Sequence, residues 1–164
     1  MSQARVLIVD DDADLLQALS LALQLRMDGL TVDTADSAVA ALGHIGARDY
    51  DAIVTDIKMP GMDGLALLAE IRGRQPDTPT LMITGHGEHD LAVQALRGGA
   101  YDFVQKPIDR DSFVASLYRA IRAHVLIRRV KERQSALECC ASELEQIAEK
   151  LGREVRPKSV RGEP

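Results

Sequence analysis

The chain has 164 residues, 46% of them apolar, which suits one domain with a substantial core and an additional segment. Aromatic residues make up 3% and Trp is absent, so Leu, Val, Ile and Ala must form most of the core. The net charge of −5 argues against a general nucleic-acid binder.

Short apolar runs alternate with segments of helical periodicity along residues 1–124. Five runs predict strands, at residues 6–9, 31–35, 52–55, 80–83 and 101–104. The second run is half polar and suits an edge of the sheet. Helices follow each run, and five side chains are placed to cap them: Asp12, Asp14, Ser37, Asp63 and Asp109. This alternation predicts an α/β fold, a doubly wound five-stranded parallel sheet with helices on both faces.

The fifth helix is predicted to continue beyond the domain as a helical, coiled-coil extension. A heptad can be written with Val130, Leu137, Leu144 and Leu151 at d, after Ala123. The a positions are filled by Ile127, Gln134, Ala141 and Ala148. We expect a folded α/β domain of residues 1–124, a helical extension of residues 125–151 that pairs as a homodimer, and a disordered tail of residues 152–164. Two alternatives to the homodimer stay open: the apolar stripe of d residues could fold back on its own domain, or it could bind another protein.

Charge and cysteine content separate these segments and indicate a compartment. Residues 1–124 hold 11 Lys/Arg against 18 Asp/Glu, whereas residues 125–164 hold 9 against 7. Cys139 and Cys140 are adjacent, without the spacing of metal ligands or of a disulfide framework. No signal-peptide region and no membrane-spanning run of about 20 apolar residues is visible. We expect a cytoplasmic protein without membrane contact.

Acidic or polar residues stand at the ends of four of the predicted strands. Asp10 and Asp11 follow the first strand, Asp56 the third, Thr84 the fourth, and Lys106 the fifth after Gln105. Since the carboxyl ends of parallel strands share one edge, these groups should meet in one crevice. Carboxylates about 4 Å apart repel by about 4 kcal/mol at an effective dielectric near 20, so they need a cation. Hard oxygen ligands predict Mg²⁺, with Mn²⁺ as an alternative.

Four motifs in this order resemble the receiver domain of two-component response regulators. They are Val9-Asp-Asp-Asp12, Thr55-Asp-Ile-Lys-Met-Pro-Gly-Met-Asp-Gly64, Met82-Ile-Thr-Gly85 and Gln105-Lys-Pro107. The resemblance covers about residues 4–124. The run Ile83-Thr-Gly-His-Gly87, together with Ala92-Val-Gln-Ala95 and Gly99-Ala-Tyr-Asp-Phe103, looks most like receivers of enhancer-binding transcription activators. The resemblance implies a flavodoxin-like strand order of 2-1-3-4-5 and a phosphorylation-dependent response regulator, with a sensor histidine kinase as its partner.

The resemblance also assigns roles to the metal-binding end of the crevice. Asp56 would be the phosphoacceptor. Asp11 and Asp56 would bind Mg²⁺ directly, together with the backbone carbonyl of Lys58. Asp10 would act mainly through a coordinated water. The chain would catalyse only its own phosphorylation and dephosphorylation, with output through a downstream protein partner or the coiled coil and not through direct nucleic-acid binding.

The remaining roles concern the phosphoryl group and the switch. Lys106 would pair with Asp56 and then with the phosphoryl group, and the Thr84 hydroxyl would reach a phosphoryl oxygen. Phe103 occupies the aromatic switch position, although a plain core role is equally compatible with the sequence. The bond before Pro107 is expected to be cis, against a base rate of about 5–6% for X-Pro bonds.

Two rival functions remain for the same residues. A Mg²⁺-dependent phosphatase would use Asp-x-Asp after the first strand, and Asp10 and Asp12 have that spacing. A scaffold that is never phosphorylated would need only the coiled coil. His86 and His89 near the crevice are interpreted as solvated, and His124 as a surface histidine, since an all-oxygen site does not need them. The resemblance leaves one alternative open for His86, because its place and the Lys58 side chain influence the dephosphorylation rate in receivers.

Overall fold

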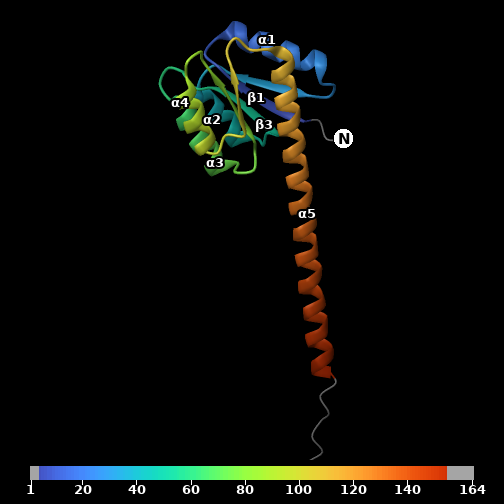
Figure 1. The fold of residues 1–164 in the computed structure, drawn as a ribbon. Helices are drawn as coiled ribbons and strands as arrows, with labels where there is room; N and C mark the ends of the chain where they lie inside the picture. The colour runs from blue at the N-terminus through green and yellow to red at the C-terminus, as the bar shows by residue number, and fades with distance from the viewer. Residues whose placement is uncertain (1–3, 155–164) are drawn as a thin grey trace, which may run out of the picture. The chain divides into compact units, whose positions relative to one another are not determined.

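The computed structural model describes residues 4–154, in which β-α units follow one another along the chain (Figure 1). The strands are β1 (Arg5–Val9), β2 (Thr31–Ala35), β3 (Ala52–Asp56), β4 (Thr80–Thr84) and β5 (Asp102–Gln105). The helices are α1 (Ala13–Arg26), α2 (Ala38–Ala47), α3 (Gly64–Arg74), α4 (His89–Arg97) and α5 (Arg110–Glu154). All neighbouring strands are parallel, in the order β2-β1-β3-β4-β5. The predicted fold class and strand order are confirmed.

The central strands are buried on both faces because helices cover both sides of the sheet. Alternate residues of β1 separate accordingly: Val6 and Ile8 belong to one apolar cluster, and Leu7 and Val9 to another. The first cluster adds side chains of α1 and of the start of α5, among them Leu16, Leu19, Leu23, Phe113 and Leu117. The second adds side chains of α2 and α3, among them Ala41, Ile45, Leu67 and Ile71. Continuous apolar runs are what such a sheet requires.

Side-chain caps begin four of the five helices in residues 4–154, α4 being the exception, and of the two predicted caps of α1 Asp14 is wrong. Ser37, Asp63 and Asp109 accept hydrogen bonds from backbone N–H groups of the first turns, at 3.2, 2.8 and 2.8 Å. At α1 the cap is Asp12, whose Oδ1 accepts from the N–H groups of Asp14 and Leu15 at 3.0 and 3.2 Å. The helix therefore starts one residue after Asp12, and Asp14 lies in its first turn.

The first turns of α5 pack on the sheet, and they bury a histidine. His124 is 6% exposed, and its Nδ1 lies 2.9 Å from the carbonyl oxygen of Asp77. It continues the stripe of Phe113, Leu117 and Ile121 at helical spacing, all of which face the core. The interpretation of His124 as a surface residue is therefore wrong.

The described part of the chain divides into two units, residues 4–126 and residues 127–154. The helix α5 ends at Glu154, so residues 152–154, which the sequence placed in a disordered tail, are helical. The rest of that predicted tail lies outside the described residues. Within residues 4–154, no helix has both the length and the apolar character needed to cross a membrane.

Gly64, the first residue of α3, lies against the backbone that carries Asp56. Its N–H donates to the carbonyl of Ile57 at 2.7 Å, and a Cβ at this position would clash with the Asp56 carbonyl oxygen and lie 2.8 Å from the Cα of Ile57. Because the obstacle is backbone, Gly64→Ala must displace the end of β3. We expect the free energy of unfolding to fall by about 1–3 kcal/mol, as for other overpacked sites.

Denaturant unfolding of Gly64→Ala would measure this loss, with Gly73→Ala as the matched control. Gly73 lies in the same helix, and a Cβ there would meet nothing within 4 Å. The control should gain up to about 1 kcal/mol from helix propensity alone. A Gly64→Ala protein as stable as the wild type would contradict the close approach.

Candidate functional site

Four polar residues lie at the carboxyl ends of four neighbouring strands, along one edge of the sheet. Asp10 follows β1, Asp56 ends β3, Thr84 ends β4 and Lys106 follows β5. Lys106 Nζ lies 3.0 Å from Asp56 Oδ2 and 3.5 Å from Asp10 Oδ2. Because β1, β3, β4 and β5 are consecutive in the sheet, parallel topology alone brings these residues together.

Three carboxylates form the acidic part of this edge. One oxygen each of Asp10, Asp11 and Asp56 lies within 4.8 Å of the others, the one group of this kind found in residues 4–154. Asp10 is 1% exposed and Asp56 5% exposed, whereas Asp11 is open to solvent. Oxygen ligands of this charge fit a hard divalent cation, and the exposed Asp11 leaves room for its waters. The arrangement suits Mg²⁺, and it includes no histidine.

Burial is the main reason why the pKa of Asp10 is raised. The nearby charge of Asp56 raises this pKa further, while the N–H of Asp12, 2.8 Å from Asp10 Oδ1, and the Lys106 ammonium oppose the shift. An anionic Asp10 is thus costly without a cation beside it.

Lys106 supplies positive charge to the edge and is held in place by its backbone. Its N–H donates to the carbonyl of Thr84 at 2.8 Å, and the Lys106–Pro107 peptide bond is cis. Burial would lower the pKa of Lys106, but the hydrogen bond to Asp56 and the charges of Asp10 and Asp56 raise it. Lys106 therefore stays protonated at neutral pH and neutralises part of the acidic cluster.

The other residues assigned to the phosphoryl group and the switch lie on β4 and β5. Thr84 is buried at the end of β4, in register with Gln105 of β5. Phe103 is 37% exposed on β5, so it is only partly covered in this state. The backbone of Thr84 is thus joined to that of Lys106, and the Phe103 side chain lies at the surface of β5.

The loop after β3 carries Lys58, and its side chain contacts a residue that the sequence analysis missed. Lys58 Nζ lies 2.5 Å from Glu88 Oε1, and Glu88 Oε2 accepts the N–H of Gly85 at 2.6 Å. The bond to Lys58 is the main cause of a lowered pKa of Glu88, and the Gly85 N–H adds to it. No local pattern marks Glu88, because its cationic partner comes from a different loop. His86 and His89 are exposed, as expected.

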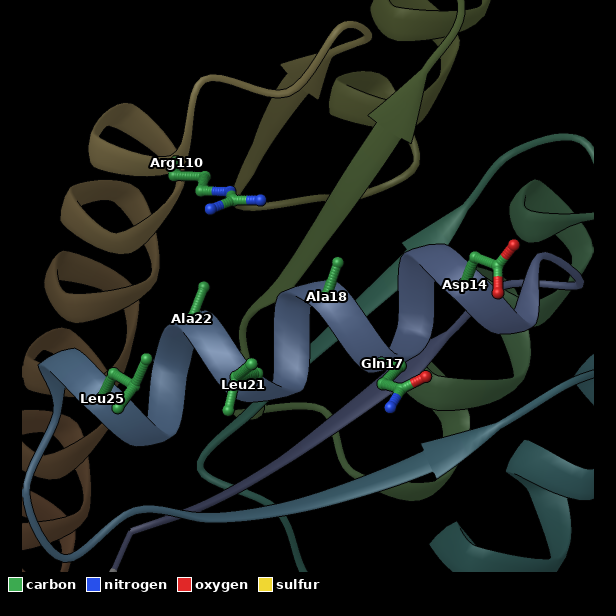
Figure 2. A pocket seen from close by; sticks show the side chains of 7 residues that line it. All are labelled: Asp14, Gln17, Ala18, Leu21, Ala22, Leu25 and Arg110. Atoms are coloured by element: carbon green, nitrogen blue, oxygen red, sulfur yellow. The ribbon is translucent and has the colours of Figure 1, made fainter.

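A separate apolar hollow lies along α1. It has a volume of about 300 Å³, and Figure 2 shows Arg110, at the start of α5, on the opposite side from the α1 side chains. The lining residues on α1 are Asp14, Gln17, Ala18, Leu21, Ala22 and Leu25. None of the three clustered carboxylates lines this hollow, so it is distinct from the acidic site at the sheet edge.

Comparison with known proteins agrees with this geometry. Residues 6–118 match the family model described as response regulator receiver domain. The chain is 40% identical over 144 residues to the C4-dicarboxylate transport transcriptional regulatory protein DctD of Rhizobium meliloti, covering 88% of this chain and 31% of that protein. It is 40% identical over 121 residues to the DNA-binding transcriptional regulator NtrC of Escherichia coli strain K12, covering 74% and 25%.

A solved structure gives the same answer for the fold. NtrX of Brucella abortus, crystallised with ATP, superposes with a TM-score of 0.73 at 38% identity, covering 79% of this chain and 29% of that one. The chain thus spans about a third or less of these relatives. These relatives confirm the predicted resemblance to receivers of transcription activators.

Proposed function

This chain belongs to the family of response regulator receiver domains, and we propose that it accepts a phosphoryl group on Asp56 from a sensor histidine kinase. The observation that carries the proposal is the placement of Asp56, buried at the sheet edge with Lys106 at 3.0 Å and two further carboxylates beside it. A lone structural aspartate would not need this neighbourhood.

The transfer needs a nucleophile, charge neutralisation and little else. An Asp56 carboxylate oxygen attacks phosphorus in line, an oxygen–phosphorus bond forms, and the phosphorus–nitrogen bond of the phosphohistidine breaks. Lys106, already beside that carboxylate, balances the charge on the phosphoryl oxygens, and the Thr84 hydroxyl donates to one of them. Asp11, Asp56 and the Lys58 carbonyl, with Asp10 through a water, would hold Mg²⁺, which would supply electrostatic stabilisation of these oxygens.

The proposed chemistry is limited to the chain's own phosphorylation and dephosphorylation, not turnover of other substrates. The rival phosphatase would use Asp12 together with Asp10. Asp12 Oδ1 accepts two N–H groups of the first turn of α1, at 3.0 and 3.2 Å. That carboxylate oxygen is committed to capping the helix, which disfavours the rival.

Intact mass measurement tests the proposal directly. Incubation with acetyl phosphate and Mg²⁺ should add the mass of one phosphoryl group to the full chain. The added group should be lost at alkaline pH or with hydroxylamine, since an acyl phosphate is labile to both. An unchanged mass would support the scaffold function instead.

We also propose that residues 127–154 form a coiled-coil homodimer, or bind a downstream protein, to produce the output. Their stripe at d positions is exposed: Val130, Leu137, Leu144 and Leu151 are between 56% and 71% exposed. Burying one such side chain completely is worth about 1.5–3 kcal/mol, so several together can offset the cost of association. Gln134 and the alanines at a keep the pairing modest. The proposed location is the cytoplasm.

Breaking the stripe should convert a dimer into a monomer. We expect Leu137→Glu with Leu144→Glu to sediment as a monomer at tens of micromolar, because four like charges would face each other in the seam. Ser135→Glu with Ser142→Glu is the matched control, since both serines are exposed at b positions and point away from the seam. A wild-type chain that is monomeric with and without phosphorylation would assign the stripe to another partner.

A further inference from the structure

The Glu88 carboxylate bridges the two loops that leave β3 and β4. One oxygen accepts the N–H of Gly85 at 2.6 Å, and the other lies 2.5 Å from the Lys58 ammonium. Glu88 is the residue before α4, yet its side chain makes no capping bond to that helix. The Glu88 side chain therefore joins the two loops to each other and does not cap α4.

Both partners of Glu88 are close in the chain to the proposed site of phosphorylation. Lys58 stands two residues after Asp56, and Gly85 directly follows Thr84. The strands that carry them are neighbours, with Asp56 in register with Ile83. Glycine at position 85 permits the contact, because a Cβ there would lie 3.0 Å from the Glu88 Cδ.

We propose that Glu88 is a latch: in the unphosphorylated protein its carboxylate occupies the Gly85 N–H and the Lys58 ammonium, and a phosphoryl group on Asp56 must compete for both. A phosphoryl group carries about −1.5 to −2 charges at neutral pH and seeks the same donors and cations. The latch rests on the proposed function, and it makes Glu88 a positioning residue that slows phosphoryl uptake.

The direction of the effect follows from charge. Glu88 is an anion near the site that an anionic phosphodonor must reach. It is bonded to the Lys58 ammonium and also interacts electrostatically with Lys106, so it offsets the positive charge of both. Glu88→Gln removes the charge and keeps the shape. We expect the initial rate of phosphoryl uptake to rise about three- to tenfold, less at high salt, since screening weakens partly exposed charges.

The test compares full-length wild type, Glu88→Gln and Asp90→Asn by intact mass, with acetyl phosphate below saturation and Mg²⁺ present. In this reaction the Asp56 oxygen–phosphorus bond forms while the acetyl oxygen–phosphorus bond breaks and acetate leaves. Asp90→Asn is the matched control, because Asp90 is exposed in the first turn of the same helix and loses the same charge. Its rate should stay within about twofold of the wild type, as expected of a distant screened charge.

The Gly85 amide resonance in ¹⁵N-labelled protein gives a second readout that a general loss of structure would not produce. Its proton should move upfield in unphosphorylated Glu88→Gln, because a neutral amide oxygen is a weaker acceptor than a carboxylate. Asp90→Asn should leave it in place, and phosphorylation of the wild type should move it.

Equal initial rates in wild type and Glu88→Gln, or the same acceleration in Asp90→Asn, would overturn the latch alone. An unmoved Gly85 resonance in Glu88→Gln would do so as well. No mass gain in the wild type would overturn the proposed function, and the latch with it.

Discussion

Asp56→Asn is expected to take up no phosphoryl group from acetyl phosphate and Mg²⁺, whereas the wild type gains one. The amide is nearly isosteric with the carboxylate but is not a nucleophile, and Asp10, the other carboxylate bonded to Lys106 Nζ, lies at 3.5 Å against 3.0 Å for Asp56. The fold should be retained, because losing the bond from Lys106 is offset by removing one of three neighbouring negative charges. Intact mass, with thermal unfolding to check the fold, measures both.

Asp12→Asn is the informative control for this result. Asn caps helices about as well as Asp, so α1 keeps its start while the alternative carboxylate disappears. This variant should gain the same mass as the wild type. If Asp56→Asn still gained the mass and Asp12→Asn did not, the phosphoryl group would be on Asp12, and the phosphatase function would be favoured.

Asp11→Ala should bind Mg²⁺ at least about tenfold more weakly than the wild type, a loss of about 1.4 kcal/mol in binding free energy. Asp11 is the exposed member of the acidic cluster, so its loss removes a ligand without leaving a buried cavity. Calorimetric titration of Mg²⁺ or Mn²⁺ measures the change. Asp14→Ala is the charge-matched control, because Asp14 is also exposed but lies outside the cluster.

Histidine substitution separates this metal centre from a transition-metal site. His86→Ala should bind Mg²⁺ as the wild type does, since an all-oxygen centre has no use for imidazole. Undiminished binding in Asp11→Ala, or a loss in His86→Ala, would contradict the assignment of ligands.

The metal affinity should also fall with pH in a defined direction. The pKa of Asp10 is raised above 3.8, chiefly by burial, so its proton competes with the cation at a higher pH than in a free aspartate. Binding is then complete above that raised pKa and is lost as the pH falls through it. In Asp10→Asn the remaining pH dependence should shift to lower pH, as titration at several pH values would show.

The fold was predictable because each strand carries its own signal. Runs such as 52–55 and 80–83 are apolar on both faces, which suits central strands, and β2 with its exposed Thr34 is the edge that its polarity predicted. The meeting of Asp10, Asp56 and Lys106 needed only the rule that parallel strands share one carboxyl edge.

What the sequence hid were contacts between segments far apart in the chain. Glu88 is unremarkable beside its neighbours, and only the folded loops bring Lys58 to it. His124 was interpreted as a surface histidine, whereas the first turns of α5 carry a stripe that faces the sheet, and His124 continues that stripe. One apolar stripe of α5 packs on the core and a different stripe runs along the extension. Hydrophobic periodicity alone does not show at which residue the first stripe gives way to the second.

The three consecutive aspartates after β1 are not interchangeable copies. Asp10 is buried and bonded to the Asp12 N–H, Asp11 faces solvent within the acidic cluster, and Asp12 caps α1. Deleting any one of them leaves the same two-residue string, so the three deletions are one and the same protein. In that protein two carboxylates would have to do the work of three: the buried position of Asp10, the exposed position of Asp11 and the helix cap of Asp12. Either the start of α1 or the affinity for the metal must then be lost. A single substitution in this run therefore affects one role at a time, whereas a change in its length affects the metal cluster and the helix cap together.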